Sequence, residues 1–351
     1  MTMRLEHPFY ATGIGSLPHQ DEDSAFRLII ENFPEIPFWP QLPKHSPREG
    51  MVLQYSEGFP SFRWDKKEQR FWIDTSVGFA EDVERFSKAI EEQDLEPFEI
   101  TEALAKGLRI LEILTREEYR NRMKYIKGQV TGPITFGLSL TDQDRRPAFY
   151  DPTLRDILVK HLSSKARWME RKFQELFPDK TSIVFFDEPS LSSFGSAFSG
   201  LSREDVILSL NECFKAVRGF KGIHCCGNTD WGLLLSTDLD ILSFDAYGYL
   251  DTLSLYPKEL RRFLERGGIL AWGIVPTNEN VVREDVQSLV ERLRKGMEIL
   301  SAKGIDRELL HQAILTPSCG AASLPVQLAE RVCRLTSEVS RRIRETTGIL
   351  E

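Results

Sequence analysis

A histidine and a cysteine stand two residues apart in the segment Gly-Ile-His-Cys-Cys-Gly-Asn-Thr-Asp, which runs from Gly222 to Asp230. The apolar residues before them predict a β-strand, and alternate side chains of a strand point to the same side. His224 and Cys226 can therefore share one ligand, while Cys225 faces the other way. Because imidazole and thiolate are donors that zinc favours in proteins, this segment predicts part of a zinc site.

Two further candidate ligands follow later apolar runs. Asp245 closes the run Ile-Leu-Ser-Phe, and Cys319 follows a predicted strand in the sequence Leu-Thr-Pro-Ser-Cys-Gly. The carboxyl ends of parallel strands meet at one rim of a barrel, so both side chains converge there with His224 and Cys226 if the chain forms a barrel. Three strong donors from distant strands leave a fourth position open. This is typical of catalytic zinc rather than of structural zinc, which four protein ligands usually close.

The alternative role for any cysteine in a long chain is to pack in the core as a small hydrophobic residue. Cys213 and Cys333 lie within predicted helices, and we interpret both in that way. For His224, Cys226 and Cys319, the positions at strand ends favour catalytic zinc over core packing and over a structural zinc site.

Two other motifs end predicted strands. Asp187-Glu188-Pro189 can bring one or two carboxylates to the same rim, although either carboxylate can equally begin a helix. The turn from Thr12 to Ser16, Thr-Gly-Ile-Gly-Ser, presents backbone N–H groups that can receive a carboxylate, and it can also be a simple tight turn.

Short β-rich runs alternate along the chain with amphipathic helices, and these elements must position the candidate residues. This alternation favours parallel strands joined by helices. We predict a (β/α)8 TIM barrel in a single domain over residues 1–351. The eight predicted strands are residues 11–15, 38–41, 125–130, 182–186, 222–225, 241–244, 269–272 and 313–315. Residues 62–73 predict an inserted β-hairpin, placed either over the mouth of the barrel or on its surface as a simple loop.

Composition excludes some functions. The chain has 351 residues, of which 53 are Asp or Glu and 45 are Lys or Arg, and the net charge of -8 disfavours nucleic acid and anionic membranes as partners. No apolar run is long enough to span a bilayer, and the first residues show no apolar signal core. Five cysteines do not suggest a disulfide framework. We therefore expect a reduced, cytoplasmic protein.

Five motifs follow one another in the order found in the catalytic barrel of cobalamin-independent methionine synthase, which this chain resembles. They are Ile-Gly-Ser16, Thr-Gly-Pro133, Asp-Glu-Pro189, His-x-Cys226 and Cys-Gly320. The segment from His224 to Asp230 is also similar to the zinc motif of corrinoid-dependent methyltransferases related to uroporphyrinogen decarboxylase.

The resemblance implies a Zn2+ ion held by His224, Cys226 and Cys319, with Asp245 at the position of the family's acidic ligand, which is usually Glu. It implies that Ile14, Gly15 and Ser16 hold the carboxylate of an amino-acid thiol, and that Asp187 holds its ammonium group. The activity implied is methyl transfer to a small thiol, foremost homocysteine, to give methionine.

Departures from the family bear on the methyl donor. A tryptophan that stacks on folate in the family falls near Ser139 here, a family histidine falls in residues 273–276, and the amino-terminal barrel of the long synthases has no counterpart. These changes favour a methylated corrinoid protein over methyl-tetrahydrofolate as the donor. The alternatives are transfer to another thiol such as coenzyme M, a decarboxylase-like enzyme without metal, and a non-enzymatic zinc-binding barrel.

Overall fold

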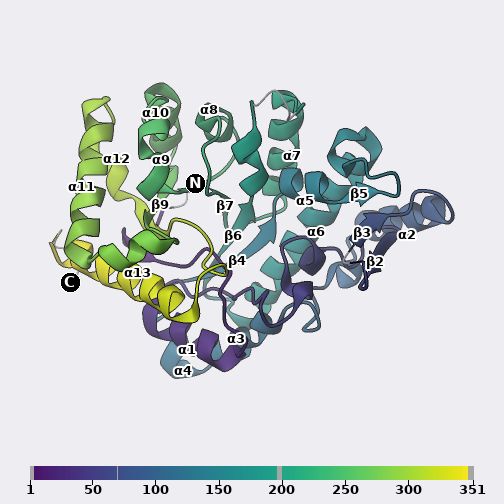
Figure 1. Cartoon of the computed structure of the whole chain (residues 1–351), viewed down its shortest axis with the longest axis horizontal. Coiled ribbons are helices and arrows are strands. Elements are labelled where there is room, and N and C mark those ends of the chain that lie inside the picture. The colour runs from purple at the N-terminus through teal and green to yellow at the C-terminus, as the bar shows by residue number, and fades with distance from the viewer. Residues whose placement is uncertain (1–3, 69, 196–199, 347–351) are drawn as a thin grey trace.

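Short runs of apolar residues form a curled sheet of seven parallel strands (Figure 1). The computed structural model describes residues 4–68, 70–195 and 200–346. Around the sheet the order is β1-β10-β9-β8-β7-β6-β4. The strands are β1 Tyr10–Ala11, β4 Tyr125–Thr131, β6 Thr181–Asp187, β7 Phe220–Cys225, β8 Ile241–Phe244, β9 Ile269–Val275 and β10 Ala313–Pro317.

The gap between the two edge strands is spanned by residues 37–41, the second strand predicted from the sequence. On one side the Lys127 N–H donates to the Pro37 carbonyl at 3.0 Å, and on the other the Gln41 N–H donates to the Gly15 carbonyl at 3.0 Å. Isolated parallel bridges join Phe38 to Lys127 and Ser16 to Gln41. The arrangement is compatible with the predicted barrel, although β1 is shorter than predicted and residues 38–41 form bridges rather than a continuous strand.

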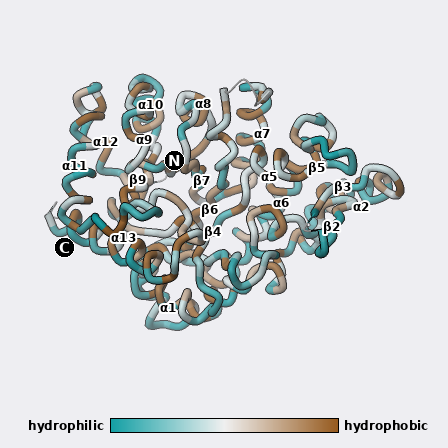
Figure 2. Tube along the Cα trace, viewed as in Figure 1, coloured by the Kyte–Doolittle hydropathy of each residue, from teal (hydrophilic) through white to brown (hydrophobic). Residues whose placement is uncertain are grey.

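Helices follow the strands and cover the outer face of the sheet, as in a chain of βα units. Figure 2 shows brown and teal residues alternating around α11 and α13, as expected for helices with one face on the sheet and one in water. The helices in this layer are α1 Glu22–Asn32, α5 Pro133–Ser139, α6 Pro152–Leu176, α7 Arg203–Lys215, α8 Trp231–Leu235, α9 Ala246–Leu253, α10 Pro257–Glu265, α11 Val286–Ala302, α12 Arg307–His311 and α13 Val326–Thr346. The connection between residues 41 and 125 adds α2 Phe79–Glu91, α3 Ile110–Leu114 and α4 Glu117–Arg120. None of the described helices is both long and apolar enough to cross a membrane.

The segment predicted as a hairpin contains β2 Phe62–Asp65 and β3 Arg70–Ile73, which pair antiparallel. Strand β3 also pairs in parallel with β5 Thr141–Asp142, so a small three-stranded sheet forms. In Figure 1 this sheet lies with α2 at the end of the molecule away from α11.

The inside of the curled sheet changes from apolar to polar along the strands. Toward the amino ends, the inward side chains form one apolar cluster that includes Tyr10, Tyr125, Ile183, Phe220, Ile241, Ile269 and Ile314. Because alternate residues of a strand face the same side, the same rows continue toward the carboxyl ends as polar side chains. These are Gln129, Thr131, Asp187, His224, Ser243 and Thr316, all of them buried.

Candidate metal centre

Three predicted ligands come together at the carboxyl ends of the strands. His224 lies near the end of β7, Cys226 follows that strand, and Cys319 follows β10; one ligand atom from each lies within 4.8 Å of the others. The alternation of β7 places Cys225 on the opposite side, where it is buried in the core beneath the helices. The structure therefore shows a group of His and Cys side chains that could hold one metal ion.

The hydrogen bonds of His224 leave one ring nitrogen available. Its Nδ1 lies 2.9 Å from the Ser243 hydroxyl of the neighbouring strand β8. Its Nε2 is buried and has no hydrogen-bond partner among the described residues. A metal-ligating histidine commonly uses one nitrogen for the metal and the other for an orienting hydrogen bond, so the imidazole is arranged as a ligand would be.

The two cysteine sulfurs interact with each other. A hydrogen bond from Cys319, and then the neighbouring His224, hold the pKa of Cys226 well below its usual value against the opposing effect of burial. The same hydrogen bond and burial raise the pKa of Cys319. One thiolate is thus stabilised next to a thiol, and a bound cation would favour loss of the second proton as well.

Asp187, the last residue of β6, lies beside His224 in the sheet, where the two residues are register partners. It is buried, and its Oδ1 has no hydrogen-bond partner in the part of the chain that the structure describes. Burial raises the pKa of this carboxyl, while His224 and Lys127 act in the opposite direction. A buried polar atom without a partner is uncommon in folded proteins, so this oxygen is available to a ligand.

The neighbouring carboxylate, Glu188, has a different position. It accepts hydrogen bonds from the Ile134 N–H at 2.8 Å, the Thr135 N–H at 2.8 Å and the Thr135 hydroxyl at 2.7 Å. These groups form the first turn of α5. A Cβ atom on Gly132 would lie 2.3 Å from the Glu188 carboxyl carbon, so the glycine of the Thr-Gly-Pro motif leaves room for this contact. Of the two carboxylates in the sequence motif, Glu188 caps a helix and Asp187 faces the site.

Asp245 stands outside the group of three donors. Its Oδ1 accepts a hydrogen bond from the Gly248 N–H at 2.8 Å and caps the start of α9. Burial raises the pKa of Asp245 to about 6, and the charge of Cys226 makes a smaller contribution in the same direction. The short side chain is held by its own helix, so the structure does not bring Asp245 together with the His and Cys ligands. A direct or water-mediated bond to the metal stays a prediction.

The turn of Ile14, Gly15 and Ser16 lies next to Cys319 and Gly320. The Ala321 N–H donates to the Ser16 carbonyl at 2.9 Å, and a Cβ atom on Gly320 would lie 2.1 Å from the Ser16 hydroxyl. The carbonyls of the turn are therefore engaged by the protein. The N–H groups of Gly15 and Ser16 have no acceptor among the described residues, which suits an anion.

Two buried residues of the site were not predicted. Ser243 orients His224, and Lys127 of β4 donates from Nζ to the Ile14 carbonyl at 2.6 Å. The signal for Lys127 was present in the sequence, since a lysine in the middle of a buried strand must find partners for its charge.

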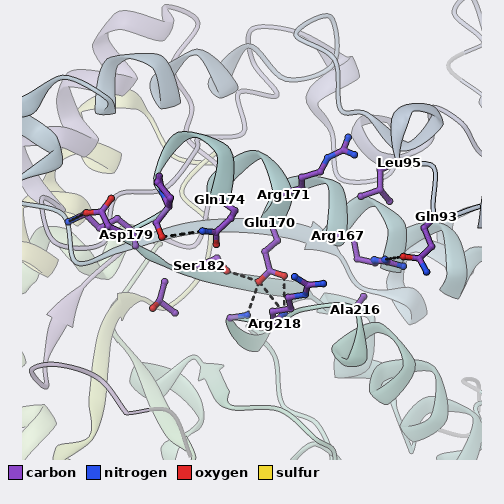
Figure 3. Close-up of a pocket in the computed structure, with 14 residues that line it drawn as sticks. Gln93, Leu95, Arg167, Glu170, Arg171, Gln174, Asp179, Ser182, Ala216 and Arg218 are labelled. Carbon is purple, nitrogen blue, oxygen red and sulfur yellow. Dashed lines mark hydrogen bonds and ion pairs between the residues drawn. The ribbon is translucent and has the colours of Figure 1, made fainter. Parts of the chain in front are cut away.

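A cavity of about 630 Å3 lies at the other end of the strands, where it is lined by Thr181 and Ser182 at the start of β6 and by Gly219 just before β7. Figure 3 shows Ser182 and Glu170 in this cavity. Glu170 accepts hydrogen bonds there from the Ser182 hydroxyl at 2.7 Å and the Gly219 N–H at 2.7 Å. Because catalytic groups of barrel enzymes gather at the carboxyl ends, this cavity does not compete with the His and Cys group as the active site.

Fold and site together define the chain as a barrel-like α/β protein with a candidate metal centre at its carboxyl rim. No protein-family model matches the sequence, and no curated protein sequence does. Two solved structures are similar over nearly the whole chain. One is a Listeria monocytogenes protein assigned as a vitamin-B12-independent methionine synthase, with a TM-score of 0.58 and 14% identity over 96% of this chain and 98% of that one. The other is a methyltransferase from Methanosarcina mazei, with a TM-score of 0.52 and 14% identity over 95% and 94%. At this identity the likeness establishes a shared fold.

Proposed function

We propose that the protein is a zinc-dependent methyltransferase that transfers a methyl group to the thiol of homocysteine and so forms methionine. The observation that carries the proposal has two parts: a ring nitrogen of His224 and the sulfurs of Cys226 and Cys319 lie within 4.8 Å of one another, and the buried Nε2 of His224 has no hydrogen-bond partner among the described residues. The fold that the chain shares with the methyltransferase from Methanosarcina mazei supports it.

The donor set fits zinc. In a tetrahedral site, bonds of about 2.0–2.3 Å place two donors of one zinc ion about 3.5–3.8 Å apart. The three ligand atoms lie within 4.8 Å of one another, so they would draw together on binding the ion. One nitrogen and two sulfurs leave a fourth position for the acceptor thiol. When bound, zinc lowers the pKa of a coordinated thiol, so the acceptor sulfur is held as the thiolate that attacks the methyl carbon.

The residues of the chain prepare that attack in separate ways. Ser243 fixes the direction of the His224 ring. The thiolates of Cys226 and Cys319 would balance the charge of a bound Zn2+, so an added acceptor thiolate would make the centre net negative and its sulfur would stay nucleophilic. In this proposal the free Oδ1 of Asp187 receives the ammonium group of the acceptor, and the turn at Ser16 receives its carboxylate. The acceptor is then held at two charged ends with its sulfur between them.

A methylated corrinoid protein is the donor that the residues favour. Position 139 is a serine rather than a stacking tryptophan, and a Cβ atom on Gly273 would lie 2.4 Å from the Phe244 carbonyl, which leaves no room there for a larger side chain. A donor carried by a protein needs a docking surface, and residues 62–73 are our candidate. This segment carries Trp64 and Trp72, each with a cationic side chain over its ring.

Zinc analysis combined with X-ray absorption spectroscopy tests the proposal. Purified protein should contain about one zinc per chain with two sulfur ligands, and homocysteine should add a third sulfur. A protein without zinc, or a zinc centre that gains no sulfur from homocysteine, would refute the function.

A further inference from the structure

A fully buried lysine lies inside the sheet, close to the proposed acceptor site. Lys127 of β4 donates from Nζ to the Ile14 carbonyl at 2.6 Å and to the Gln129 side-chain oxygen at 3.3 Å. The ammonium group also lies 4.6 Å from the ring centre of Phe185. Burying a lysine is costly unless its charge is used. The apolar cluster below it offers no partner for that charge, and the charge of Asp187 acts on Lys127 from the other direction along the sheet.

The bond to Ile14 determines the direction of another group. A trans peptide is planar and its C=O and N–H point in opposite directions. Because Lys127 holds the Ile14 carbonyl, the Gly15 N–H of the same peptide points away from Lys127. The next peptide is held in the same way, since the Gly15 carbonyl accepts from the Gln41 N–H at 3.0 Å, which orients the Ser16 N–H.

The close packing of this turn leaves little freedom for another arrangement. A Cβ atom on Gly15 would lie 2.7 Å from the side-chain carbon of Gln129, and the Gln129 amide in turn donates to the Trp39 carbonyl at 3.1 Å. The positive charge of Lys127 also polarises the peptide that it binds, which makes the Gly15 N–H a better donor to an anion.

We propose that Lys127 is a positioning residue that selects acceptor thiols carrying a carboxylate, by fixing and polarising the Ile14–Gly15 peptide whose N–H receives that carboxylate. The inference rests on the proposed function and adds to it a residue and a substrate requirement. Lys127 itself does not touch the acceptor in this proposal; its effect passes through the peptide.

Thiol binding measured by calorimetry on the zinc-loaded protein tests the proposal without a methyl donor. The probes are homocysteine, 3-mercaptopropionate, which keeps a carboxylate, and 2-mercaptoethanol, which has no charge. Lys127→Met, which keeps the length of the side chain, should weaken homocysteine and 3-mercaptopropionate by roughly tenfold, as expected for a charge-assisted interaction. Binding of 2-mercaptoethanol and the zinc content should stay unchanged.

Lys165→Met is the matched control. Lys165 is equally buried, but it lies on α6 and donates to the Glu99 carbonyl at 3.1 Å, away from the turn. This variant should leave the affinities of all three thiols unchanged. If Lys127→Met does not fold, Lys127→Gln serves for the same comparison.

Four results would overturn the proposal. Equal weakening of charged and uncharged thiols by Lys127→Met would show a general structural role, and no weakening would show no role. Wild-type protein that binds 3-mercaptopropionate no more tightly than 2-mercaptoethanol would overturn the carboxylate requirement whatever the variants do. Wild-type protein that binds none of the three thiols would remove the proposed function as well, so the two failures are distinguishable.

Discussion

Replacing Ser243 with alanine should weaken zinc binding although Ser243 is not a ligand. Its hydroxyl lies 2.9 Å from Nδ1 of His224 and both residues are buried. If Nε2 binds the metal, Nδ1 carries the proton of the neutral ring and donates it to the Ser243 oxygen. Ser243→Ala removes this acceptor and leaves the ring orientation without its hydrogen bond.

Two estimates of the free-energy cost of losing the Ser243 hydrogen bond give similar values. A buried donor left without an acceptor costs about 1–3 kcal/mol. Loss of the outer hydrogen bond of a metal-ligating histidine lowers metal affinity by about 10- to 100-fold, which corresponds to about 1.4–2.7 kcal/mol. The second estimate refers directly to metal affinity, whereas the cost in the first also falls on the metal-free protein, where Nδ1 makes the same hydrogen bond.

Competition with a chromophoric zinc chelator measures the effect, and thermal unfolding of the metal-free protein checks the fold. Ser340→Ala is the matched control, because Ser340 is a buried serine of α13 whose hydroxyl donates to the Phe9 carbonyl at 2.6 Å. Zinc affinity within twofold of wild type in Ser243→Ala, or an equal loss in the two variants, would refute the assignment of Nε2 as the ligand atom.

Four further predictions concern the ligands, the acceptor, the donor and pH. Cys226→Ser and Cys319→Ser should each lose most of the zinc and all activity while remaining folded, whereas Cys213→Ser should keep its zinc and lose some stability; full zinc occupancy in both ligand variants, by metal analysis, would contradict this. Asp187→Asn should weaken homocysteine by about tenfold to a hundredfold and 3-mercaptopropionate far less, as measured by calorimetry, since only homocysteine has an ammonium group. Methylcobalamin or a methylated corrinoid protein should support turnover and methyl-tetrahydrofolate should support little, in parallel assays; efficient folate turnover by this chain alone would contradict the donor assignment. Burial raises the pKa of Glu49 from 4.5 to about 7 in the folded protein. Folding therefore favours the protonated carboxyl. Its contribution to the free energy of unfolding should be fully present below pH 4.5 and lost as the pH rises to about 7. Glu49→Gln should remove up to about 3 kcal/mol of this pH dependence in urea unfolding, and identical pH profiles of variant and wild type would count against it.

Strand periodicity was sufficient to predict the central group of the site. The alternation of side chains placed His224 and Cys226 on one side and Cys225 on the other, and the carboxyl-end rule brought Cys319 to them. These inferences use only local geometry and the topology of parallel strands. The same rule did not bring Asp245 into the group, because Asp245 also begins a helix and its short side chain is held by the Gly248 N–H. A capping residue and a metal ligand look alike in the sequence when both follow a strand.

Contacts between distant segments could not be predicted. The partner of Lys127 is the carbonyl of Ile14, 113 residues earlier in the chain, and no property of Ile14 in the sequence marks its carbonyl as an acceptor. The strand at 38–41 was predicted, but it forms only bridges; Pro37 and Pro40 lack the N–H groups that a continuous ladder needs. Backbone partners of this kind depend on the curled shape of the sheet and not on local residue preferences.

The charges of the site favour an amino-acid acceptor over a neutral thiol. Within residues 4–68, 70–195 and 200–346, Asp187 presents a buried oxygen without a partner, and the turn at Gly15 and Ser16 presents N–H groups without acceptors. A neutral thiol that shielded these groups from water would leave both unsatisfied, at a cost of about 1–3 kcal/mol for each buried polar group. An amino acid supplies an ammonium group for the first and a carboxylate for the second, so its binding removes both costs together. Lys127 makes its hydrogen bond to the turn at the carboxylate end and acts on Asp187 only through its charge. Its removal should therefore weaken carboxylate-bearing thiols, whereas removal of the Asp187 charge should weaken only the thiol that carries an ammonium group.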